Sequence, residues 1–270
     1  MQAAPGPDGI PAICLKMCKG PISRMLNKIF QSSYAHSEVP DDLKLAFVTP
    51  IHKGGTRTEP ANFRPVSLTS HIIKTLERVI RKDLVRYLEA NGKMDPNQHG
   101  SRTGRSTLSQ LLEQQDEILN MIENGENADM VFLDFAKAFD KCDHGILLQK
   151  LKSLGIKGRL GRWIHSFLSD RKQRVVVRGH RAGSSKVVSG VPQGSVLGPI
   201  LFLAYISDIG NNIRANMKIY LDDSKAKDKI ETEEDVETLQ ESLDQLYAWG
   251  KSNNMKFNGS KFQVLRFWPK

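Results

Sequence analysis

The chain has 270 residues, 39% of them hydrophobic, and a net charge of +9 from 39 Lys and Arg against 30 Asp and Glu. It can bury a core, which excludes a disordered tail, a fibrous repeat and a disulfide-stapled miniprotein. The positive charge favours a polyanionic partner, either nucleic acid or an anionic membrane surface. Three cysteines and the lack of a signal peptide favour a reduced, intracellular protein. The longest apolar run, 199–206, is too short for a membrane span, so a membrane partner would have to be peripheral. Of the two polyanionic partners, nucleic acid is expected and a membrane is not.

Positive charge is concentrated in one part of the sequence. Residues 141–186 contain 12 Lys and Arg against two Asp, a net charge of +10, so the rest of the chain nets −1. Trp163, Phe167 and three valines are interleaved with these cations, which is typical of a surface that follows a phosphate backbone; a solvated charged face is an equal alternative. Residues 228–244 carry eight acids and one lysine, a net charge of −7, and are expected to form a solvated face.

Hydrophobic periodicity predicts mostly helices in the N-terminal half. A turn cluster at 6–11 is followed by a helix that begins near Ile22 and ends before Pro40. A strand is expected at 45–51. Two amphipathic helices are then expected at residues 72–88 and 108–122, each followed by a glycine that ends it.

Strands and helices alternate in the C-terminal half, and the whole pattern predicts an α+β fold. The expected strands are 130–135, 173–178, 186–189, 217–221 and 262–267. The expected helices are 146–154, 160–168, an apolar helix that runs from the Gly- and Pro-rich loop 190–199 to Gly210, and 235–250.

Acidic residues occur where two of these strands end. Asp134 lies within the expected strand 130–135, and Asp222 and Asp223 follow the expected strand 217–221. An acid in a buried strand costs several kcal/mol unless it is paired or binds a metal. If the two strands are neighbours, their carboxylates converge into an oxygen-rich site suited to Mg²⁺, and two such ions can promote phosphoryl transfer. The alternative for Asp222 and Asp223 is the tip of a simple hairpin.

These residues carry a resemblance to a known family. Residues 220–223 resemble the Y-x-D-D box of reverse transcriptases, 134–140 their D-x-x-x-x-F box, and 192–194 their P-Q-G box. Four further segments resemble other family motifs in the right order: 6–11, 49–53, 62–68 and 258–267. The resemblance covers nearly the whole chain and is to the non-LTR retrotransposon (LINE- or jockey-like) branch.

The resemblance implies the fingers and palm of a right-hand polymerase. The fingers and an N-terminal extension are expected in 1–128 and the palm in 129–270, with 155–190 contributing to their junction. The palm is expected to be an antiparallel ferredoxin-like sheet backed by helices. No thumb or endonuclease region of the parent element is expected within this sequence.

The resemblance also implies roles for individual residues. Asp134 and Asp222 match the ligands of two Mg²⁺ ions, which Mn²⁺ can replace, with Asp223 as the third catalytic carboxylate and the Phe135 carbonyl as an extra ligand. The residues that match nucleotide-binding positions are Lys53, Arg64, Phe139, Gln193, Gly194 and Lys261. Among these, Phe139 matches the residue that excludes a ribose 2′-OH, although a core aromatic is its alternative, and Lys261 matches a general acid beside the pyrophosphate.

The function implied is that of an RNA-directed DNA polymerase, which adds a dNTP to a DNA primer 3′-OH on an RNA template. An inactive retrotransposon-derived fragment that only binds nucleic acid is the alternative. Another two-metal palm enzyme, such as a nucleotidyl cyclase, is disfavoured by the fingers motifs. Leu221 departs from the Ala that is common in this branch, and altered efficiency is expected from it.

Overall fold

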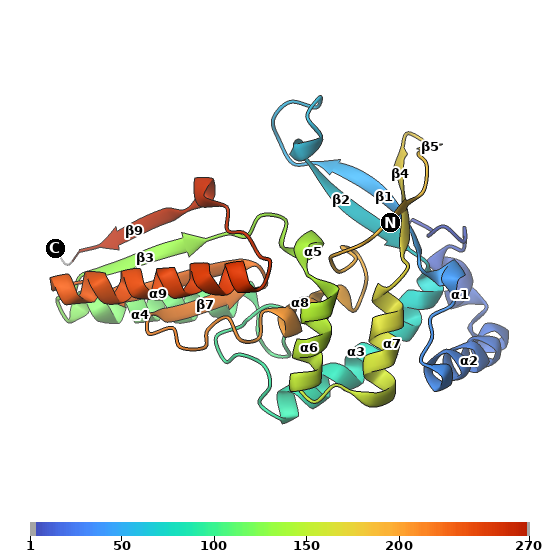
Figure 1. The fold of residues 1–270 in the computed structure, drawn as a ribbon, viewed down its shortest axis with the longest axis horizontal. Coiled ribbons are helices and arrows are strands. Elements are labelled where there is room, and N and C mark those ends of the chain that lie inside the picture. Colours follow the sequence, from blue (N-terminus) through green and yellow to red (C-terminus); the bar gives the residue numbers. More distant parts are fainter. Residues whose placement is uncertain (1–3, 269–270) are drawn as a thin grey trace. The chain divides into compact units, whose positions relative to one another are not determined.

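The computed structural model describes residues 4–268 and divides into two compact units (Figure 1). Unit 1 contains the residues up to Arg86 and His144–Leu201, and unit 2 contains Tyr87–Asp143 and the residues from Phe202 onward. Each unit is therefore built from two separate stretches of sequence, and the boundary expected at residue 128 falls inside unit 2. In the described part of the chain, no helix has both the length and the apolar character needed to cross a membrane.

Unit 1 combines helices with a small mixed sheet. The strand order is β2-β1-β4-β5, with β6 also paired to β4; β1 is antiparallel to β2 and parallel to β4. The strands are β1 (Leu45–His52), β2 (Phe63–Thr69), β4 (Lys172–Val177), β5 (His180–Arg181) and β6 (Ser185–Lys186). The helices are α1 (Ala12–Met17), α2 (Lys19–His36), most of α3 (His71–Ala90), α6 (His144–Ser153) and α7 (Gly158–Leu168), with short turns η1 (Asp41–Leu43) and η2 (Pro60–Asn62).

Strand β2 was not expected from the hydrophobic pattern. It contains Pro65, which lacks an N–H to donate and therefore argues against a central strand. The structure tolerates this proline because β2 lies at the edge of the sheet, where Pro65 faces Pro50 of β1.

The aromatic residues of the basic segment lie in the core of unit 1. Trp163 and Phe167 of α7 have no exposed surface and stack on each other with ring centroids 5.6 Å apart. The indole Nε1 of Trp163 donates to the hydroxyl of Ser33 on α2 at 2.9 Å, which satisfies its only polar group. The expectation that these aromatic rings belong to a surface for a phosphate backbone is therefore wrong, because their spacing on α7 turns both toward the core.

Unit 2 is centred on a four-stranded antiparallel sheet, as expected, with the order β7-β8-β3-β9 (Figure 1). This order, with helices in the connections, is the βαββαβ arrangement of ferredoxin-like folds. The strands are β3 (Ala128–Leu133), β7 (Asn216–Tyr220), β8 (Asp223–Lys229) and β9 (Gln263–Phe267). The helices are α4 (Thr107–Glu123), α5 (Ala138–Lys141), α9 (Glu233–Ser252), the turn η3 (Gly259–Lys261), and α8 (Gly198–Tyr205), which begins in unit 1.

Helices α4 and α9 cover opposite faces of this sheet. Side chains alternate along β8, and Lys225 and Lys227 reach Gln114 and Glu117 of α4 at 2.9 and 2.6 Å. The intervening Ala226 is fully buried on the other face, where α9 packs against β8. Both helices begin at capping boxes, in which the side chain of Ser106 or Thr232 accepts the backbone N–H three residues later and the side chain at that position accepts the N–H of the capping residue.

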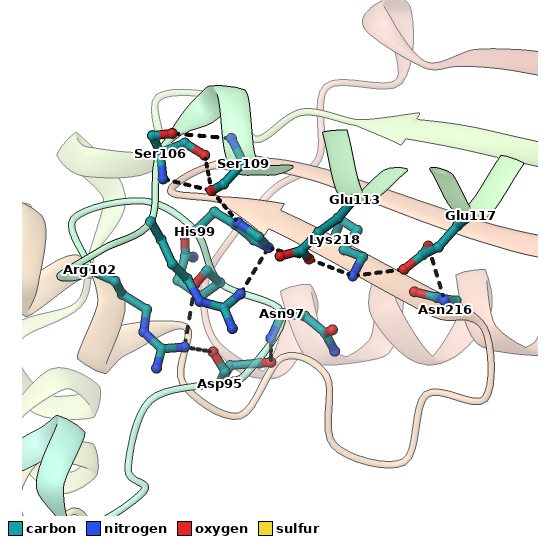
Figure 2. A network of polar contacts seen from close by, with 12 residues as sticks. Asp95, Asn97, His99, Arg102, Ser106, Ser109, Glu113, Glu117, Asn216 and Lys218 are labelled. Carbon is teal, nitrogen blue, oxygen red and sulfur yellow. Dashed lines mark hydrogen bonds and ion pairs between the residues drawn. The ribbon is translucent and has the colours of Figure 1, made fainter. Parts of the chain in front are cut away.

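A polar network joins the segment before α4 to that helix and to β7 (Figure 2). The buried His99 has its Nδ1 3.2 Å from the Ser109 hydroxyl and its Nε2 3.0 Å from Arg105 Nη1. Since a guanidinium can only donate, Nε2 must be the acceptor and Nδ1 must carry the proton of a neutral ring. Glu113, 3.3 Å from the same Nε2, also holds Lys218 of β7 at 3.2 Å.

We predict that this histidine makes stability depend on pH. Burial lowers the pKa of His99 below 6.5, although Glu113 opposes the shift. The unfolded chain then binds a proton more readily than the folded chain, so the free energy of unfolding falls as the pH drops below 6.5 toward the lower folded pKa. Urea unfolding between about pH 5 and pH 7.5 should show a smaller fall for His99→Gln than for the wild type. The exposed His180→Gln variant should retain the wild-type fall, and equal curves for all three proteins would contradict this account.

Candidate active site

The acidic residues of the two motifs meet at one end of the sheet of unit 2. Leu133 at the end of β3 pairs with Ser224, and Tyr220 at the end of β7 pairs with Asp223, so the next residues emerge at the same edge. Asp134 and Asp223 line one cavity of about 540 Å³. Asp134 was expected inside the strand, but β3 ends one residue earlier, at Leu133. The side chain of Asp134 is about one-fifth exposed. The strand therefore positions the acid that follows its last residue.

Lys261 lies directly on this acidic cluster. Its Nζ is 2.5 Å from Asp134 Oδ2, and this hydrogen bond, together with the charges of Asp134, Asp223 and Asp222, raises the pKa of Lys261. The chain around it is fixed by backbone bonds on both sides of Asp134: Asn258 N donates to Asp134 O, and Ala136 N to Lys256 O, each at 2.8 Å. This contact joins Lys261 to the acidic motif across 127 positions of sequence.

Two phenylalanines of the D-x-x-x-x-F box have different surroundings. Phe135 is buried, and its ring stacks on Phe257 at 4.4 Å, so its side chain belongs to the core behind the acids. Phe139 lies in α5 and is half-buried, with its ring stacked on Phe202 of α8 at 4.7 Å. The packing of Phe139 on Phe202 agrees with its core alternative, and the residue as a whole keeps part of its surface exposed.

The expected triphosphate-binding residues gather in unit 1. Arg64 of β2 is exposed and faces Ile51 of β1, and Lys53 N, just after β1, donates to Asn62 O at 2.8 Å. The P-Q-G loop joins the free edge of β2, where Ser67 N donates to Gln193 O at 2.7 Å.

Gly194 of that loop has no room for a side chain. An added Cβ would lie 2.4 Å from Ser67 O, and its φ of +118° is one that only glycine adopts without strain. Ser67, where the P-Q-G loop joins β2, is three residues from Arg64. The loop and Arg64 are therefore about 10 Å apart along the strand.

A buried glutamate that the sequence analysis did not single out holds the loop that follows. Glu77 of α3 is fully buried, and its Oε2 accepts the N–H groups of Val196 and Leu197 at 2.6 and 2.8 Å. Burial raises the pKa of Glu77, and burial likewise lowers that of the buried Arg171 to about 10; the attraction between the two opposes both shifts. Glu77 lies on the apolar face of the helix, four residues after Ile73, and an acid at a core position was the available signal.

The described residues contain no group of three or more His, Cys, Asp and Glu side chains already arranged around a metal ion. In this conformation the ammonium of Lys261 provides the positive charge beside Asp134. The donor set nevertheless suits a divalent cation, because Asp134 and Asp223 line one cavity and carboxylate oxygens are hard ligands for such ions.

Solved structures identify the class of fold. Apo telomerase from Candida tropicalis superimposes with a TM-score of 0.61 at 12% identity, covering 91% of this chain and 49% of that one. A form of it truncated from the C-terminal domain gives a TM-score of 0.60 at 13% identity and covers 92% of this chain and 55% of that one. The mixed α+β fold of this chain is thus one that telomerase shares.

Sequence comparison then gives the family. The model described as "Reverse transcriptase (RNA-dependent DNA polymerase)" matches residues 51–267, and the chain belongs to this family. The probable RNA-directed DNA polymerase from transposon X-element of Drosophila melanogaster is 32% identical over 98% of this chain, and that from mobile element jockey is 31% identical over 99%. This chain spans 30% of the length of each of these relatives. The resemblance drawn from the motifs is confirmed.

We predict that Glu77 is a major determinant of the stability of unit 1. Replacing it by Leu leaves the N–H groups of Val196 and Leu197 without their acceptor and removes the negative charge near the buried Arg171 guanidinium. This should lower the free energy of unfolding by about 3–5 kcal/mol. Glu123→Leu, at an exposed helical position, should change it by less than about 1 kcal/mol. Chemical denaturation of both variants checks this, and comparable losses would show that burial of Glu77 contributes little.

Proposed function

We propose that this chain is the polymerase region of a non-LTR retrotransposon RNA-directed DNA polymerase. It would extend a DNA primer by dNTP on an RNA template. The observation that carries the proposal is the meeting of Asp134, Asp223 and Lys261 around one cavity, at motif positions that the family match covers. The printed names of the jockey and X-element relatives support the same activity.

In this proposal Asp134, Asp222 and Asp223 are the catalytic carboxylates and, with the Phe135 carbonyl, hold two Mg²⁺ or Mn²⁺ ions. When bound, the ions would neutralise charge on the attacking and leaving oxygens of a phosphoryl displacement. The chain's own contribution is to fix the carboxylates through the β3–β8 register. Lys261 balances their charge and is placed to hold a proton at Nζ beside the leaving group.

We propose that Lys53, Arg64, Gln193 and Gly194 bind the incoming nucleotide. Arg64 presents a guanidinium fork from an edge strand, and such forks bind phosphate oxygens through paired hydrogen bonds. Glu77 contributes by holding the backbone just after the P-Q-G loop. Phe139, which is only half-buried, is proposed to discriminate against a ribose 2′-OH.

We propose that the fingers lie in 1–128 and the palm in 129–270. The sheet of β1 and β2 falls in the first range and the four-stranded antiparallel sheet in the second, which supports this division. Residues 155–190 belong to unit 1 although they follow the first palm strand, in line with a contribution to the fingers/palm junction. Helix α4 packs on the palm sheet although it precedes residue 129.

The exposed cations of β4, β5 and the turn between them suit a nucleic-acid partner. Arg174, Arg178 and Arg181 are exposed, whereas Arg171 of the same segment is buried and serves the core. Phosphate neutralisation by such residues makes binding fall steeply with salt. A fragment that binds nucleic acid without catalysis would use the same cations, so only incorporation of nucleotide separates the two functions.

We predict that Asp222→Asn abolishes synthesis. Primer extension with an RNA template and Mg²⁺ should be measured for this chain and for a jockey polymerase whose matching 30% it replaces. Loss of a charge that stabilises the transition state should lower kcat by roughly 10³-fold or more, since each 1.4 kcal/mol is tenfold.

Asp116→Asn, at an exposed position on α4, is the control and should retain the wild-type rate. Retained salt-dependent RNA binding with no extension by the wild type in either protein would favour the binding fragment and reject the polymerase.

We predict that Arg64→Lys raises the KM for dNTP by about tenfold, because an ammonium cannot form the paired hydrogen bonds of a guanidinium. The value of kcat should fall less than the KM rises. Arg24→Lys on α2 should leave both constants unchanged. Steady-state kinetics with a single dNTP decides, and an unchanged KM for Arg64→Lys would remove this residue from the nucleotide site.

A further inference from the structure

The turn that carries the acidic pair contains a strained residue. Leu221, between the end of β7 and Asp222, has a φ of +57°, in the left-handed region. A residue with a Cβ loses about 1–2 kcal/mol there, and such a conformation persists only where the surroundings hold it. The neighbours of Leu221 therefore decide where the next two carboxylates point.

A short segment before α4 extends the sheet beside this turn. Ile219 N donates to Asn97 O at 3.0 Å and His99 N donates to Ile219 O at 2.9 Å, so Gln98 pairs with Ile219 as an added parallel bridge. Figure 2 shows the contacts that fix this segment. The Arg102 guanidinium donates to the Asp95 carbonyl within the segment, and His99 connects it to Ser109 of α4.

The side chain of Gln98 continues this pairing past the end of β7. The residue is 4% exposed, and its Oε1 accepts the N–H of Leu221 at 3.0 Å and that of Gly100 at 2.6 Å. The amide oxygen therefore stands where the carbonyl of a longer strand would be, and it satisfies the N–H of the strained residue. One buried acceptor with two donors leaves little freedom for either backbone.

Gly100 provides the space for this contact. A Cβ added there would lie 2.8 Å from Leu221 Cγ, 2.9 Å from Leu221 N and 3.0 Å from Gln98 Oε1. Any side chain at this position would push the turn away from Gln98. The bulky Leu221 side chain thus packs against a glycine in the neighbouring segment.

We propose that Gln98, with Gly100, is a positioning residue of the polymerase site: it fixes the left-handed Leu221 and thereby aims Asp222 and Asp223. This inference rests on the proposed function. It implies that loss of the Gln98 acceptor lowers the rate of chemistry and leaves nucleotide affinity unchanged, because Gln98 is not among the residues proposed to contact the nucleotide.

The test compares Gln98→Leu, which removes the acceptor, with Gln98→Glu, which keeps one. Hydrogen exchange of the Leu221 amide should accelerate about tenfold or more in Gln98→Leu and stay near the wild-type rate in Gln98→Glu. Gln114→Leu, the same change at a buried glutamine on α4, is the matched control and should leave this amide protected. Unchanged exchange in a folded Gln98→Leu variant would overturn the proposal.

Kinetics in the jockey chimera form the second arm. Gln98→Leu should lower kcat about 10- to 100-fold with the KM for dNTP within about twofold, and Gln98→Glu should recover most of the rate. A rise in KM with unchanged kcat would overturn the assignment. If the wild-type chimera extends no primer, the proposed function fails while the exchange arm still decides whether Gln98 holds Leu221.

If Gln98→Leu fails to fold, the same change is made in a Leu221→Gly background. Glycine adopts positive φ without strain, so the cost of losing Gln98 should be smaller there. An equal loss of stability in both backgrounds would show that Gln98 does not act through the conformation of Leu221.

Discussion

The register between β3 and β8 determines where the acidic side chains of unit 2 lie. Leu133 pairs with Ser224, so the strand ends place Asp134 and Asp223 at one edge. A slip of one residue would turn every side chain of β8 to the opposite face, burying its lysines against α9 and removing Asp223 from the cavity. The hydrogen bond of Lys225 to Gln114 and the ion pair of Lys227 with Glu117 oppose that slip, because both require the observed face of β8 to lie against α4.

Charge compensation is the second constraint on this molecule. A cluster of like charges at one sheet edge is unfavourable until a cation joins it, and Lys261 supplies that cation from a turn far away in the sequence. In the interior of unit 1 the cost is different: Glu77 and Arg171 are buried, so their charges lose the hydration that water would provide. There the backbone N–H groups after the P-Q-G loop provide most of the compensation, so the cost of burial is offset by fixing a loop.

The sequence predicted regular elements well where periodicity was strong. The expected helix at 72–88 is α3, and the expected strands at 45–51 and 217–221 are β1 and β7. Periodicity could not reveal β2, whose pattern Pro65 interrupts, or β8, whose alternating lysines and small residues look polar. The burial of Trp163 and Phe167 was missed because the composition of 141–186 was taken as a whole, whereas their i, i+4 spacing on α7 places both on the apolar side that faces the core.

The candidate site was predictable in part for a similar reason. The positions of Asp134, Asp222 and Asp223 follow from strand ends, and motif order pointed to Lys261. Glu77 and Gln98 accept backbone N–H groups that lie about 120 residues away in sequence, those of Val196 and Leu197 for Glu77 and that of Leu221 for Gln98. An acid at a core position marked Glu77 as unusual, but no local pattern or motif names these distant donors. Residues that hold the backbone of a site in this way can be identified only once the tertiary contacts of the chain are known.

The interleaving of the two units bears on how the chain folds. Unit 2 takes its first stretch before residue 144 and its second after residue 201, and Lys261 reaches Asp134 across 127 positions. Contacts so distant in sequence form slowly, because a long loop must close before they stabilise anything. During synthesis on the ribosome, β3 and Asp134 therefore cannot pair with β8 until residues 144–201, which belong to unit 1, have been made. The acidic edge is completed late, when the last strand docks, so incomplete chains lack an assembled cavity.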